Sequence, residues 1–199
     1  MPGAIVYSVD SSDCIVAVNV AWAQFARAND GAHLLEPDIL GRRLWDLISD
    51  PTTQEIYRAL VRRVRQGITS VRFGFRCDAP DRRRLLQMAM SPLENDGVLF
   101  EVSPLVVQDR PAVALLQPSV ARGGDAMRIC GWCKRMPSSQ GMWLEIEEAV
   151  PTFNLFDEAP LPDLTHGICP ACNASMMAAM DDAELGASGQ VCLGNLRVE

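Results

Sequence analysis

Two C-x-x-C pairs, Cys130–Cys133 and Cys169–Cys172, constrain this chain more than any other feature. Each pair places two thiols on one short turn, where both sulfurs can bind the same ion at about 2.3 Å. Two such turns supply four sulfur ligands, the tetrahedral set that structural zinc sites use. The spacing therefore predicts one zinc ion bound by Cys130, Cys133, Cys169 and Cys172.

His166 is a fifth candidate donor, because it stands three residues before Cys169. We favour the four-cysteine set, since each paired turn delivers two sulfurs with matched geometry. His166 would then donate a ring N–H to a cysteine sulfur from outside the ligand set. A set of three cysteines and His166, with Cys172 displaced, stays open.

A redox dithiol is the alternative interpretation of the first pair. A thioredoxin-like dithiol needs a strand before it and a helix after it, and the Pro-Ser-Ser-Gln-Gly run at 137–141 ends any helix within a few residues. Covalent haem attachment needs His directly after the second cysteine, where Lys134 and Asn173 stand instead. A structural metal site is therefore the prediction.

The length of 199 residues allows one domain of average size and a smaller one. No apolar run approaches the eighteen or so residues of a membrane span, and no basic run precedes an apolar core near the N-terminus. We expect a cytoplasmic protein without membrane contact. The odd number of cysteines, seven, is typical of a reducing compartment and leaves Cys14, Cys77 and Cys192 as free thiols.

The negative charge is concentrated in the segment that holds the cysteine pairs. Residues 1–110 carry 13 arginines against 14 acidic residues, whereas residues 111–199 carry 5 basic against 11 acidic residues. A module that binds nucleic acid needs a basic face to neutralise phosphates. We therefore expect no nucleic acid partner, and favour a protein partner or a structural role.

The first half of the chain alternates strand and helix patterns. Apolar runs at 5–9 and 14–18 flank a turn-forming tetrapeptide and predict a hairpin. Asn19 is the expected N-cap of a helix that ends near 29–31, and residues 41–49 predict a buried helical turn.

A longer amphipathic helix should begin near Asp50 and end at Gly67, with Thr52 and Glu55 as a capping box. Its outer face carries Arg58, Arg62 and Arg65, which predicts a solvated charged face with an anion site as the alternative. Period-two patterns at 71–77, 86–90 and 98–103, joined by turn sequences, predict an antiparallel meander.

The resulting order, two strands, short helices, a long helix and three strands, resembles that of PAS domains. The strand 15–19 running into the helix 21–26, and the Gly-Arg-Arg-Leu-Trp-Asp-Leu-Ile run at 41–48, are similar to successive segments of bacterial PAS domains. The resemblance implies a domain that senses a small ligand and forms a homodimer. The flavin-photosensor motif is absent and residues 51–66 hold no histidine, which argues against flavin and haem and leaves the ligand unknown.

The segments 128–136 and 165–172 are together similar to a small C-x-x-C…HG-x-C-P-x-C module of bacterial response regulators and PAS signalling proteins. We therefore expect an α+β fold: a PAS-like five-stranded antiparallel sheet with flanking helices, followed by a zinc-stabilised module. The expected ranges are 4–107 for the PAS-like domain, 108–126 for a linker, 127–181 for the module and 182–199 for a flexible tail.

These features predict a sensory or regulatory protein and not an enzyme, because no catalytic pattern is visible and any output would pass to an unidentified signalling protein. The apolar segment 112–116 lacks an evident partner within one domain and adds to the expectation of a homodimer. The alternative is a redox or metal sensor that acts through the cysteine cluster.

Overall fold

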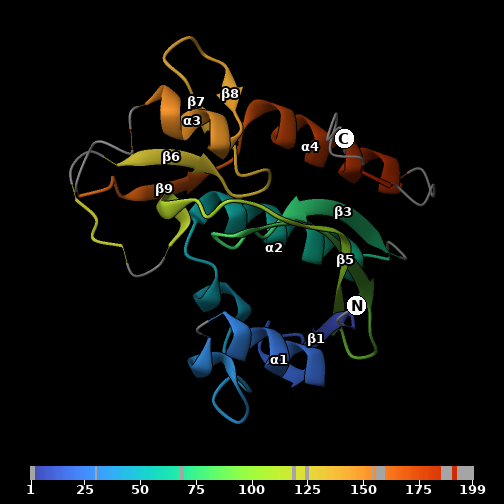
Figure 1. Cartoon of the computed structure of the whole chain (residues 1–199). Coiled ribbons are helices and arrows are strands. Elements are labelled where there is room, and N and C mark those ends of the chain that lie inside the picture. Colours follow the sequence, from blue (N-terminus) through green and yellow to red (C-terminus); the bar gives the residue numbers. More distant parts are fainter. Residues whose placement is uncertain are drawn as a thin grey trace. The chain divides into compact units, whose positions relative to one another are not determined.

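A computed structural model describes residues 3–29, 31–67, 70–117, 120–123, 126–153, 155, 160–184 and 190–191 (Figure 1). The chain forms two compact units. The first comprises Met1–Gly74, Gln87–Pro104 and Ser175–Glu199, and the second comprises Phe75–Leu86 and Leu105–Ala174. The division differs from the expected ranges because three strands run through both units, so the boundary at 107/108 stays a prediction.

The largest sheet has five antiparallel strands in the order β3-β4-β5-β1-β2, and the short β10 (Gln190–Val191) lies parallel to β3. The fold is α+β, and the five-stranded antiparallel sheet was predicted from the sequence. The elements up to the end of this meander are β1 (Ile5–Val9), β2 (Ile15–Val18), α1 (Val20–Ala28), η1 (Ala32–Leu34), η2 (Leu44–Leu47), α2 (Pro51–Arg65), β3 (Val71–Arg76), β4 (Arg82–Pro92) and β5 (Val98–Asp109).

Aromatic rings pack the first unit between its helices and strands. Tyr7 on β1 stacks on Phe100 of β5 with ring centroids 4.6 Å apart, and Trp22 of α1 meets Tyr7 edge-on at 5.1 Å. Asn19 caps α1 as predicted, because its side chain accepts a hydrogen bond of 2.9 Å from the backbone N–H of Trp22. Polar capping and ring packing together fix the start of α1 against β1.

The cap of α2 is Asp50, and the predicted Thr52–Glu55 capping box is wrong. The Asp50 carboxylate accepts hydrogen bonds from the backbone N–H of Thr53 at 2.7 Å and from its hydroxyl at 2.6 Å. Pro51 then occupies the first helical position, where its missing N–H costs nothing. The N-cap thus lies two residues before the start of the predicted box, and the helix begins at Pro51.

The second unit is built from short elements. They are η3 (Ala114–Leu116), β6 (Met127–Cys130), β7 (Met136–Pro137), β8 (Trp143–Leu144), α3 (Ile146–Thr152), β9 (Leu164–Gly167) and the start of α4 (Pro170–Glu184). β6 pairs with β9 in parallel, and β7 pairs with β8 antiparallel. α4 begins at Pro170, so Cys172 lies in its first turn and Cys169 directly precedes it.

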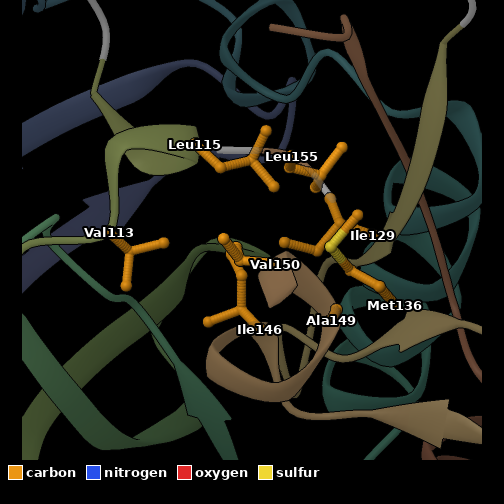
Figure 2. Packing of buried hydrophobic residues seen from close by; sticks show 8 residues of the cluster. All are labelled: Val113, Leu115, Ile129, Met136, Ile146, Ala149, Val150 and Leu155. Carbon is orange, nitrogen blue, oxygen red and sulfur yellow. The ribbon is translucent and has the colours of Figure 1, made fainter. Parts of the chain in front are cut away.

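The second unit has a hydrophobic core of its own, shown in Figure 2. Val113 and Leu115, expected within a linker, point into this core. The apolar segment that suggested a dimer surface is therefore partly buried inside the unit. The buried members are Val113, Leu115, Ile129, Met136, Ile146, Ala149, Val150 and Leu155.

Cys14 and Cys77 are free thiols, as expected, whereas Cys192 and most of the expected tail at 182–199 lie outside the described residues. None of the helices in the described part of the chain is long and apolar enough to span a bilayer.

Replacement of Asp50 by alanine should lower the free energy of unfolding by about 1 kcal/mol, because the first turn of α2 loses its N-cap. The matched control is Thr52→Ala, which removes an exposed side chain and should change the free energy by less than about 0.5 kcal/mol. Urea denaturation of both variants measures the difference. A larger loss of unfolding free energy in the Thr52 variant than in the Asp50 variant would contradict the cap at Asp50 and support the Thr52–Glu55 capping box.

Candidate metal centre

Parallel pairing of β6 and β9 brings the two cysteine turns together. Cys130 at the end of β6 lies opposite Gly167 at the end of β9, and the backbone N–H of Gly131 donates to the carbonyl oxygen of Gly167 at 2.8 Å. Parallel strands end on the same side of a sheet, so the turns that follow them are neighbours (Figure 1). The strand pair thus determines which four thiols meet.

The four thiols form one compact cluster. The Sγ atoms of Cys130, Cys133, Cys169 and Cys172 all lie within 4.8 Å of one another, and those of Cys133 and Cys169 are 3.7 Å apart. A tetrahedral ion with bonds of about 2.3 Å sets its sulfur ligands about 3.8 Å apart. The spacing of the sulfurs therefore fits one metal ion of the size of zinc.

The cluster is shielded from solvent and supplied with backbone donors. The exposed fractions of the four cysteines range from 0% for Cys130 to 8% for Cys133. The N–H of Cys169 points to the Cys130 sulfur and the N–H of Cys172 to the Cys169 sulfur, both at 3.4 Å. N–H groups in the first turn of α4 favour negative charge on these sulfurs. The site is thus prepared for thiolates.

Thiols alone cannot all ionise in this cluster. Hydrogen bonds from Cys133 and Cys172 hold the pKa of Cys130 well below its ordinary value. The same interaction with Cys130 raises the pKa of Cys133 to about 12 and also raises the pKa of Cys172. At neutral pH these three groups therefore share one negative charge. A bound cation is required before all of them can be thiolates.

His166 is not part of the cluster. It lies on β9 opposite Ile129 with an exposed side chain, and among the residues that the structure describes the group of neighbouring donors contains the four cysteines alone. The geometry brings the two C-x-x-C pairs together and leaves His166 apart. The predicted hydrogen bond from the His166 ring to a cysteine sulfur stays a prediction.

Arg76, the last residue of β3, holds the first cysteine turn. Its backbone N–H donates to the carbonyl oxygen of Trp132 at 2.7 Å, and its Nη1 donates to that of Cys133 at 3.0 Å. The side chain of Arg76 is only 1% exposed. The end of β3 therefore fixes the backbone of this turn from outside the cluster.

Acidic partners keep the buried guanidinium of Arg76 charged. It pairs with Asp78 and Glu145, and Glu145 also accepts a hydrogen bond of 2.9 Å from Arg135, two residues after the turn. Burial alone would lower the pKa of Arg76, but Asp78 and Glu145 outweigh burial and raise it. The two arginines that flank the turn thus share one carboxylate.

The same network reaches α3 and β5. Arg110 pairs with Asp78 at 3.1 Å and also with Glu147, which in turn pairs with Arg83 at 2.9 Å. Burial would raise the pKa of Glu147, but its own backbone N–H and the two arginines hold the pKa below its usual value. Ion pairs therefore connect the hairpin of β3 and β4, the end of β5 and α3 around the first cysteine turn.

In the period-two pattern at 71–77, Arg76 alternates with Phe75 and Cys77, so the pattern by itself does not indicate that Arg76 is buried. The structure buries it, because the first cysteine turn covers that face at the end of β3. A residue from a distant segment decides this burial, so period two could not reveal it.

Comparison with models of known protein families gives no match for this chain, and comparison with curated protein sequences gives none either. The case for the site therefore depends on its own geometry.

Replacement of Arg76 by methionine should lower the free energy of unfolding by about 3–5 kcal/mol, because the fully buried Asp78 loses a charged partner. The control is Arg82→Met at the start of β4. The ion pair of Arg82 with Asp109 is largely exposed and should contribute at most about 1 kcal/mol. Chemical denaturation of both variants provides the comparison. Equal small losses would mean that Arg76 does not hold the turn.

Proposed function

We propose that this chain is a cytoplasmic sensory or regulatory protein, in which a PAS-like domain works with a protein-interaction module stabilised by zinc. The observation that carries the proposal is the cluster of four buried thiols, all within 4.8 Å of one another. Four thiolates fill the tetrahedral coordination of zinc and leave no open position for substrate. The proposed zinc is therefore structural, and the proposed role is not enzymatic.

The PAS-like part of the proposal depends on the order of elements. The chain has two strands, short helices, the long α2 and three further strands, in the order that resembles PAS domains. The five strands form one antiparallel sheet. Homodimer formation is supported by the resemblance alone, because the apolar segment 112–116 contributes to the core of the second unit.

Burial favours a structural centre over a redox or metal sensor. A sensor thiolate must be reached by oxidant, and reactive cysteines are accessible as well as ionised. The sulfurs here belong to residues that are at most 8% exposed, and Trp132 between the first two cysteines is 2% exposed. A partner protein would therefore contact the outside of the module and leave the cysteines covered.

Native mass spectrometry of the purified protein should report one zinc ion per chain. Because the thiolates are buried, mild peroxide should leave this stoichiometry unchanged, whereas addition of 4-chloromercuribenzoate, which attacks thiolates stoichiometrically, should release the zinc. Cys77→Ser is the control, since that thiol lies outside the cluster and its loss should not alter the zinc content. Zinc loss at low peroxide would support the sensor, and a chain without zinc would contradict both interpretations.

A further inference from the structure

The outer face of α2 borders a surface groove of about 430 Å³ within the first unit. Its walls come from the β1–β2 turn, from η2 and from one face of α2. The residues that line it are Asp13, Trp45, Glu55, Arg58, Val61, Arg62 and Arg65. The groove therefore coincides with the basic face that the sequence predicted for this helix.

One side of the groove is fixed by Asp13. Its carboxylate accepts a hydrogen bond of 2.7 Å from Nε1 of Trp45 and pairs with Arg65 at 2.9 Å. Arg65 also donates to the carbonyl oxygens of Asp10 and Asp96. Trp45 and Arg65 are thus held in place, and the charge of Asp13 is neutralised by Arg65.

Arg58 and Arg62 remain available for a ligand. The guanidinium of Arg58 lies 4.4 Å from the ring centroid of Trp45, which positions it without neutralising it. Arg62 follows one helical turn later, and neither arginine forms an ion pair with a residue that the structure describes. Glu55 is the acidic residue of the lining besides Asp13. Apart from the Asp13–Arg65 pair, the groove thus has two guanidinium groups and one carboxylate, which leaves one excess positive charge.

We propose that this groove binds a small organic phosphate through Arg58 and Arg62. Side chains four residues apart on a helix lie about 5–6 Å apart at Cβ, so both guanidinium groups can donate to the oxygens of one phosphate. The groove volume falls in the range of about 300–1,000 Å³ typical of small-molecule sites and leaves room for the organic part of an ester. This site is independent of the proposed zinc centre.

Isothermal titration calorimetry of the full chain tests the proposal with AMP and ribose 5-phosphate as probes and adenosine and citrate as controls. Both phosphate esters should bind with a stoichiometry of one, more weakly at higher salt, whereas adenosine should not bind. Arg58→Gln and Arg62→Gln should each weaken binding at least tenfold. Both side chains are exposed, so the variants should keep the circular dichroism spectrum of the wild type.

Arg27→Gln is the matched control, because Arg27 is an exposed arginine on α1 that does not line the groove. Its affinity for both esters should equal that of the wild type. The proposal is wrong if neither ester shows saturable binding at millimolar concentration, if citrate or adenosine binds as tightly as AMP, or if the Arg27 variant loses as much affinity as the Arg62 variant.

Discussion

The structure of the second unit depends on one electrostatic constraint: four sulfurs that lie within 4.8 Å of one another are also removed from water. Such a cluster cannot carry several negative charges by itself, and its thiols compete for protons. A divalent cation removes this conflict, because it replaces the protons and neutralises two of the charges. Burial, thiol chemistry and the spacing of the sulfurs are therefore all compatible with a metal ion at this site.

A network of buried arginines and carboxylates connects the first cysteine turn to the ends of β3 and β5. Arg76 touches the carbonyl oxygens of the first cysteine turn, and Glu145 links Arg76 to Arg135 on the far side of that turn. Asp78 is fully buried, so this network is stable only while both signs of charge are present. Residues 75–86 consequently fold with the cysteine turns, and a metal bound there would contribute to the stability of the β3–β4 hairpin as well as to that of its own turns.

Sequence patterns predicted what local chemistry decides and missed what distant segments decide. The cap at Asn19, the antiparallel meander and the meeting of the four cysteines follow from side-chain type, period and spacing. The burial of Arg76 and the packing of Val113 and Leu115 depend on residues 127–155, which cover polar or linker-like positions that would otherwise be exposed. The cap of α2 was missed for a local reason, because Asp50 before Pro51 competes with Thr52 and both satisfy the composition rules for a helix start.

X-ray absorption spectroscopy at the zinc edge of the purified protein tests the central claim most directly, because it counts the atoms bound to the metal. We predict four sulfur neighbours at about 2.3 Å and an unchanged spectrum in the His166→Ala variant. Three sulfurs with one nitrogen at about 2.0–2.1 Å, lost in that variant, would make His166 a ligand and contradict the four-cysteine centre.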